Sequence, residues 1–187
     1  MLKNILLATV CVFIFSGCYY TIEPIYTAKD IISDDAILGK WGDPKTKVRW
    51  TFTKDEKNKY NAQYLGNDGI ESAFEITLVK LGKFKYLDMF VDNKKPENKN
   101  GEYKALLLGC HFYIRYTVDN DRFTFVNYAL GWIEKKLKDK ELDLHYFKRD
   151  AGYYFSDSTE SLQKVIISLE DTKEAFAKDP QVLEKIK

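Results

Sequence analysis

The sequence has few of the residues and motifs that mark special structural or catalytic classes. Only four prolines and ten glycines occur in 187 residues, which excludes a collagen-like or low-complexity chain. There are two histidines and three cysteines, with no CxxC or HxxxH spacing, so a metal site has no support. The motifs GxSxG, GxxxxGKS or GxxxxGKT, and GxGxxG are absent. We therefore expect no enzyme activity, no cofactor and no metal.

Net charge is also lacking. The chain carries 29 basic and 28 acidic residues. Lys3 is the one charged residue among residues 1–17, so the remainder is formally neutral. Nucleic-acid binding depends on neutralising phosphates with a basic surface, so we exclude nucleic acid as a partner. The hydrophobic share of 45% and the charged share of 30% are those of an ordinary globular chain.

The N-terminus has a composition of its own. Residues 1–18 read MLKNILLATVCVFIFSGC. Lys3 precedes an apolar stretch over residues 5–15, which falls short of the roughly 20 residues that span a bilayer. The small residues Ser16 and Gly17 then precede Cys18. This arrangement resembles a bacterial lipoprotein signal with its lipobox, here Phe-Ser-Gly-Cys, in which phenylalanine replaces the commoner leucine.

The resemblance implies a signal peptide over residues 1–17, diacylglycerol on the Cys18 thiol, and acylation (palmitate-like chains) of the new amino group. Each buried methylene contributes about 0.8 kcal/mol, so two or three chains make a stable membrane anchor. Tyr19 stands where aspartate would imply inner-membrane retention. The family rule therefore implies the outer membrane in a two-membrane organism, and otherwise the outer face of the cell membrane. Cys110 is then the one thiol outside the signal and the lipid site, so an intramolecular disulfide is excluded.

The processed chain divides into a tether and a domain. Residues 18–35 show no sustained periodicity, and we expect a lipidated tether there. The alternative is an extra N-terminal strand or helix packed on the domain, since Ile31 and Ile32 are apolar. Residues 36–187 form the single expected domain.

Period-2 alternation dominates the first half of that domain. Val48, Trp50 and Phe52 alternate with polar residues, which predicts a half-buried strand. Further strands are predicted over residues 60–64, 72–81 and 84–91, joined by turns at 66–69 and at Gly82-Lys83. A polar loop over residues 92–104 interrupts the pattern. Strands resume near Leu106 and are expected at 106–118, 122–129, 142–147 and 153–155.

Two helical segments complete the pattern. A short inserted helix is predicted over residues 131–138. A C-terminal amphipathic helix follows Asp157, which we expect as its cap, and short helical segments are expected near 172–177 and after Asp179-Pro180. We therefore predict a mainly β protein, an antiparallel meander closing into a lipocalin-like β-barrel of about eight to nine strands. A two-layer sandwich is the alternative.

The domain also resembles a group of uncharacterised bacterial envelope proteins. The resemblance is carried by the stretch FEITLVKLGKFKYLD at residues 74–88, by HFYIRY at 111–116, by GWI at 131–133 and by DSTESLQK at 157–164. These proteins look lipocalin-like in architecture. The resemblance lends no activity and no functional residue.

The candidate ligand-pocket residues are Asp88, Tyr86, Arg115 and His111. A carboxylate among aromatic residues can line a pocket with a raised pKa. The alternative for Asp88 is a strand-end carboxylate bonded to Arg115 or to the backbone. Cys110 and His111 are adjacent on an expected strand, so they face opposite sides and cannot form a nucleophile–base pair.

Aromatic residues are abundant, with 13 Tyr, 12 Phe and 3 Trp. Such side chains fill β cores, and they also line pockets for apolar or sugar-like ligands. We therefore expect a membrane-anchored binding module for a small apolar or amphipathic ligand. The first alternative is a structural or interaction lipoprotein that docks on another envelope component. An envelope enzyme is the second, and it lacks a motif.

Overall fold

The computed structural model describes residues 19–57, 59–91, 109–149 and 152–187. Strands predominate, as the alternation predicted. The strands are β1 (Tyr19–Thr21), β2 (Gly39–Gly42), β3 (Arg49–Lys54), β4 (Tyr60–Leu65), β5 (Glu71–Leu81), β6 (Phe84–Val91), β7 (His111–Asp119), β8 (Arg122–Val126), β9 (Tyr146–Arg149), β10 (Gly152–Phe155) and β11 (Gln181–Lys185). The helices are α2 (Leu130–Lys138) and α3 (Thr159–Ser168), with the 3-10 turns η1 (Ala28–Asp30), η2 (Asp35–Ile37) and η3 (Lys173–Ala175).

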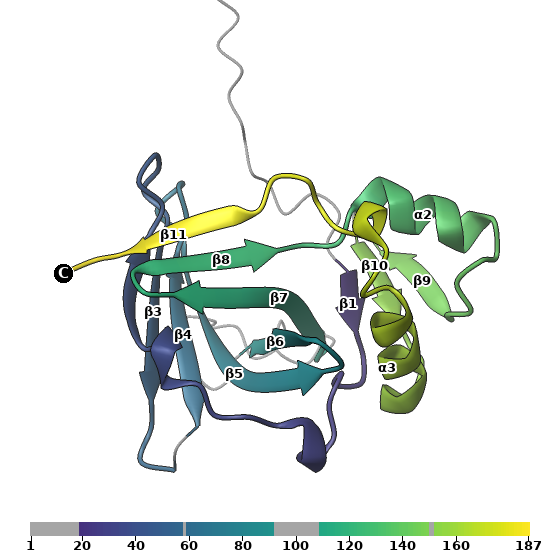
Figure 1. The fold of residues 1–187 in the computed structure, drawn as a ribbon, viewed down its shortest axis with the longest axis horizontal. Coiled ribbons are helices and arrows are strands. Elements are labelled where there is room, and N and C mark those ends of the chain that lie inside the picture. Colours follow the sequence, from purple (N-terminus) through teal and green to yellow (C-terminus); the bar gives the residue numbers. More distant parts are fainter. Residues whose placement is uncertain (1–18, 58, 92–108, 150–151) are drawn as a thin grey trace, which may run out of the picture.

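Eight of the strands close into an antiparallel barrel (Figure 1). The order around the barrel is β2-β3-β4-β5-β6-β7-β8-β11, and β11 returns to β2. Closure pairs every barrel strand on both sides, which removes the exposed edges of an open meander. The predicted lipocalin-like barrel is confirmed, and the two-layer sandwich is excluded.

Side chains fill the barrel interior. Trp50 and Phe52 point inward from β3 and stack with ring centroids 5.7 Å apart. Phe123 of β8 contacts both Trp41 and Phe52 at centroid distances of 5.3 Å. Many of the aromatic residues therefore fill the core, together with smaller apolar side chains from β4, β5, β6, β7 and β11. The buried interior comprises Ile37, Trp41, Val48, Trp50, Phe52, Tyr60, Ala62, Ile76, Leu78, Leu87, Met89, Ile114, Tyr116, Phe123, Phe125 and Leu183.

The strand that closes the barrel comes from the C-terminus. The sequence predicted a helical turn or two after Pro180, and this prediction is wrong. Residues 181–185 form β11, which pairs with β8 from Gln181 to Glu184 and with β2 at Glu184 and Lys185. The two neighbours offer unpaired backbone groups, and Leu183 fills the core between them. Long-range pairing thus overrides a local helix-start signal.

The segment expected to be a tether is packed on the domain instead. β1 pairs in parallel with β10, and its Thr21 pairs with His111 of β7. Residues 22–35, which we call the N-terminal strap, then cross the outer wall of the barrel. Ile25 is fully buried there, and the Ile32 amide donates to the Leu78 carbonyl at 2.9 Å. The packed-element alternative is therefore the observed one, because apolar strap side chains cover an otherwise exposed apolar wall.

Helix α3 lies against the outer wall of the barrel, beside β10 and β1 (Figure 1). The predicted amphipathic helix is confirmed: Leu162 and Ile166 of α3 are buried, Val165 is half-buried, and Leu169 is buried directly after the helix ends. The cap differs from the prediction, since Ser158 rather than Asp157 accepts the amide of Ser161 at 3.3 Å. The Asp157 carboxylate instead accepts the His145 backbone amide at 2.7 Å and lies 2.9 Å from the His145 Nδ1 atom.

Smaller differences concern element boundaries. The inserted helix is observed as α2, and the last predicted strand as β10. The strand predicted over residues 142–147 is displaced to Tyr146–Arg149, because Leu142 and Leu144 pack into the α2–α3 cluster rather than into a sheet. Helical structure near 172–177 is limited to η3. The predicted loop over residues 92–104, and the start of the strand near Leu106, lie outside the described residues.

The turn between β5 and β6 requires glycine. Gly82 has φ of 50°, and a side chain there would meet the Glu170 carboxylate, which lies 2.1 Å from the Cβ position. The same carboxylate accepts the Lys83 amide at 2.9 Å. This contact fastens the hairpin to the end of α3.

Candidate functional site

The four predicted pocket residues lie together on the outer wall of the barrel. Tyr86 and Asp88 stand on β6, and Arg115 and His111 stand on the neighbouring β7, with Tyr86 directly opposite Arg115. The alternate residues of both strands fill the interior. The structure therefore brings these residues into one cluster, beneath the strap and α3 rather than inside the barrel.

Asp88 and His111 form a buried pair. Asp88 Oδ1 lies 2.5 Å from His111 Nδ1, and Asp88 Oδ2 accepts the Ile25 amide at 3.3 Å. Asp88 therefore bonds to a histidine and to the backbone, whereas Arg115 does not take part. Its chief structural effect is to fasten the strap to the barrel wall.

A carboxylate that orients a histidine is one component of acid–base chemistry. Thr21 pairs with His111 across β1 and β7, and its hydroxyl has no hydrogen-bond partner among the described residues. The hydroxyl is nonetheless fully enclosed, with Thr21 0% exposed. A substrate therefore has no path to this oxygen in the folded domain.

Burial is the main cause of the raised pKa values of Tyr86 and of two neighbouring tyrosines, Tyr113 and Tyr128. It raises the pKa of Tyr86 to about 12 and moves the pKa values of Tyr113 and Tyr128 further upward, so these hydroxyls stay protonated. Arg115 lies between two rings, with its guanidinium carbon 4.3 Å from the centroid of Phe84 and 4.1 Å from that of Phe176. Such a cation–π sandwich holds the guanidinium in place against the wall.

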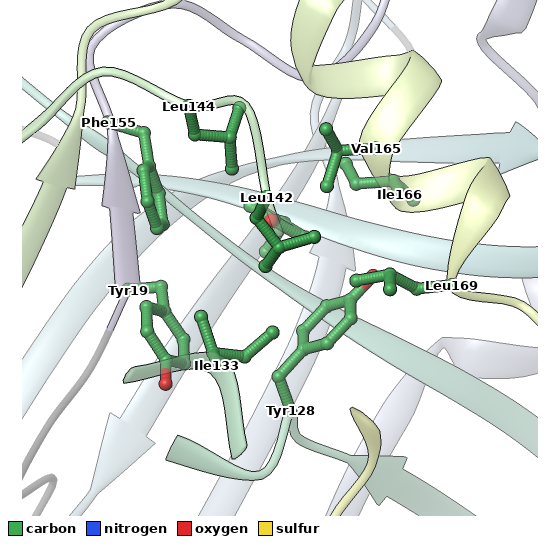
Figure 2. A pocket seen from close by; sticks show the side chains of 10 residues that line it. Tyr19, Tyr128, Ile133, Leu142, Leu144, Phe155, Val165, Ile166 and Leu169 are labelled. Atoms are coloured by element: carbon green, nitrogen blue, oxygen red, sulfur yellow. The ribbon is translucent and has the colours of Figure 1, made fainter. Parts of the chain in front are cut away.

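A small cavity lies between the barrel wall and the two helices (Figure 2). Tyr128 projects from one side, and Val165 and Ile166 of α3 project from another, together with Leu169 directly after the helix. Its volume is about 20 Å³, enough for one water molecule. The cavity is too small for a lipid or an organic ligand.

A larger hollow opens on the outer face of β2–β5. Its volume is about 270 Å³. The lining combines cationic, anionic, amide and hydroxyl side chains with a few apolar ones. We call this set the outer hollow; it is lined by Lys40, Arg49, Thr51, Gln63, Tyr64, Leu65, Glu71, Ser72, Ala73 and Ile186.

Arg49 shapes one wall of the outer hollow. Its guanidinium donates to the carbonyl oxygens of Val48 and Thr46 at 2.7 and 3.2 Å, which holds the β2–β3 connection in place. Sequence reasoning missed the outer hollow. The polar positions of β3 and β4 were visible as the solvent face, but the residues of β2, β5 and the C-terminus that complete the hollow come from distant parts of the chain, which alternation does not report.

Cys110 and the two histidines were the other candidates for chemistry. Burial raises the pKa of the Cys110 thiol, which disfavours the reactive thiolate. His145 is exposed and pairs with Asp157, 2.9 Å from Nδ1 to Oδ1. Among the described residues no group of three or more His, Cys, Asp or Glu side chains could hold a metal ion. Within the same residues, no helix has the length and apolar character needed to cross a membrane.

Comparisons with known proteins add no relative. No protein-family model matches the chain, and neither a curated protein nor a solved structure does so.

Proposed function

We propose that the chain is a lipid-anchored protein of the bacterial cell envelope that docks on another envelope component through the outer face of its barrel. The filled interior is the observation that carries this proposal. Barrels that carry apolar ligands hold them in an interior cavity. Here Trp41, Phe52 and Phe123 occupy that space and are almost fully buried. Docking is therefore better supported than the binding of a small apolar ligand inside the barrel.

The anchor is Cys18, with diacylglycerol on its thiol. The support is the positive residue, the apolar stretch and the two small residues that precede this cysteine. Tyr19 directs the protein to the outer membrane in a two-membrane organism, and to the outer face of the cell membrane otherwise.

The outer hollow is the docking surface in this proposal. Lys40 and Glu71 are exposed and place opposite charges on its rim, and Gln63 between them offers both a donor and an acceptor. A surface of this kind fits a polar segment that carries hydrogen-bonding groups and both signs of charge. Charge complementarity of this type chiefly provides specificity.

The proposed lipid anchor is tested by identifying the N-terminal residue of the mature chain and its modification. We expect mass spectrometry of membrane extracts to find a chain that begins at a lipid-modified Cys18. Cys18→Ala should release or mis-process the protein, and gradient fractionation should recover the wild type with the predicted membrane. A soluble, unmodified wild-type chain would contradict the anchor.

Docking is tested by photo-crosslinking in intact cells. A photoreactive residue at Gln63 should give one reproducible adduct, while the same residue at Thr117, exposed on the outer face of β7, should not. The double reversal Lys40→Glu and Glu71→Lys should remove the adduct and leave the melting temperature unchanged. Equal adducts at both positions, or an adduct that survives the reversal, would contradict docking at the outer hollow.

A further inference from the structure

No linker residue separates Cys18 from the folded domain, because the first strand, β1, begins at Tyr19. Tyr19 pairs with Tyr153 of β10, and the whole of β1 lies between β10 and β7. Tyr19 is 8% exposed, and its hydroxyl donates to the Leu130 carbonyl at 2.8 Å. The first residue after Cys18 is therefore already fixed to the domain by its backbone and its side chain.

This geometry restricts how an anchored domain can sit. Consecutive Cα atoms lie about 3.8 Å apart, so acyl chains on Cys18 would leave the protein within one residue of β1. A flexible linker would let the domain tumble above the bilayer. Without one, the surface around the start of β1 must face the lipid headgroups.

Helix α2 makes up much of that surface. The helix packs over the three strands that lie outside the barrel, β1, β10 and β9. The Leu130 carbonyl of α2 accepts the Tyr19 hydroxyl of β1, and the Glu134 carboxylate accepts the Lys148 ammonium of β9 at 3.2 Å. Glu134 also accepts the Tyr153 hydroxyl. Figure 1 shows α2 beside β9 and β10, at one side of the barrel.

The chemistry of this surface suits a bilayer interface. Residues 130–149 carry six Lys or Arg and four Asp or Glu, whereas the chain after residue 17 is neutral as a whole. Lys135 and Lys138 are exposed on α2, and Lys136 lies over the Trp132 ring, 5.5 Å from its centroid. Tyr146 of β9, on the same face of the strands as Lys148, is 41% exposed. Trp132 of α2 is partly buried. Basic residues beside aromatic ones are typical of surfaces that contact anionic headgroups.

We propose that α2 and β9 form a membrane-contacting surface, which seats the barrel on an anionic bilayer in one orientation. This inference rests on the proposed lipidation of Cys18. It adds a second contact to the acyl chains. The strands β3 and β4, which contribute residues to the outer hollow, lie on the other side of the barrel from α2 and β9 (Figure 1).

The three tryptophans provide a native test. Trp41 and Trp50 lie in the barrel interior, and Trp132 lies on the proposed surface. The lipidated full chain is placed in vesicles of phosphatidylcholine and phosphatidylglycerol that carry bromine near the headgroup. We expect bromine to quench part of the tryptophan fluorescence, and Trp132→Phe to abolish that part. Mass spectrometry of the same sample first establishes whether Cys18 is lipidated.

Two matched double variants distinguish a specific contact of α2 with the bilayer from a nonspecific effect of the protein's net charge. Lys135→Glu with Lys138→Glu should lose most of the quenching. Lys45→Glu with Lys47→Glu makes the same charge change in the β2–β3 connection and should retain it. Lipidated protein without quenching, or equal losses in both pairs, would overturn the membrane surface and leave the anchor intact. An unmodified Cys18 would overturn the anchor itself.

Discussion

The Asp88 carboxylate touches two parts of the chain at once, the His111 ring 2.5 Å away on β7 and the Ile25 amide 3.3 Å away in the strap. Both oxygens of a nearly inaccessible side chain are therefore used. The strap is also held from its other side, since the Gln163 amide of α3 donates to the Ile25 carbonyl at 2.9 Å. Asp88 thus connects the barrel wall to the layer that covers it.

Asp88→Ala should destabilise the domain by about 2–4 kcal/mol, because it leaves a largely buried imidazole and a buried amide without their acceptor. Urea unfolding followed by circular dichroism measures the change. Asp171→Ala is the control, since the Asp171–Lys83 pair is exposed and its loss should be hard to detect. Equal effects of the two substitutions would show that the Asp88 contacts contribute nothing beyond a surface pair.

Ile166→Asp should unfold or strongly destabilise the domain, by about 3–5 kcal/mol, because it buries an unpaired charge. Ile166 is 2% exposed and packs with Ile25, Val79 and Tyr86. The next residue, Ile167, is 44% exposed, so Ile167→Asp is a matched control that should melt like the wild type. If thermal melts of the two variants coincide with that of the wild type, α3 is not an integral part of the fold.

Removal of residues 181–187 should open the barrel, because β11 is the strand that joins β2 to β8. The two freed edges would favour association between chains. We expect a lower melting temperature and an oligomeric or aggregated elution profile in size-exclusion chromatography. Removal of Lys187 alone should change neither property. A monomer with wild-type stability after the larger deletion would refute the closing role of β11.

The His145–Asp157 pair should make stability depend on pH. The hydrogen bond that His145 donates to the Asp157 carboxylate raises the pKa of His145 above its ordinary value of 6.5. A raised folded-state pKa stabilises the domain fully below the unfolded-state pKa, and this contribution is lost as pH rises through the folded-state pKa. The effect should be small, since the His145 side chain is 84% exposed.

The measurement compares melting temperatures of the wild type and His145→Gln at about pH 5.5 and about pH 8.5. The wild-type advantage should be present at the lower pH and shrink at the higher one. An advantage that grows with pH would mean that Asp157 does not favour the protonated form of His145.

The sequence predicted the regular barrel strands because one of their faces is buried and the other is solvated. In β3, Trp50 and Phe52 alternate with Thr51 and Thr53, and the observed inward face is the expected one. In β6 the side chains on both faces are buried, because the strap and α3 cover the outer face. Alternation therefore grouped Tyr86 with Asp88, but it contained no signal for whether this face lines the interior or the outer wall.

The strands β1 and β11 were not predicted, because their strand character depends on pairing with strands far away in the sequence. β1 is three residues long, and β11 follows a proline that locally favours a helix start. Neither contains enough residues for a periodicity of its own. Both are strands because unpaired backbone groups of β10, β2 and β8 lie beside them, and those neighbours come from far along the chain.

The parallel pairing of β1 with β10 also has a consequence for the order in which the chain folds. Tyr19 cannot find Tyr153 until nearly the whole chain has emerged, and such non-local contacts form slowly. Until then β1 has no strand partner from β10, so the proposed processing at Cys18 would act on an unpaired peptide. Once β10 arrives, the same residues become an inner strand of the sheet. The lipidation proposed for Cys18 would therefore have a time window that closes when the domain folds.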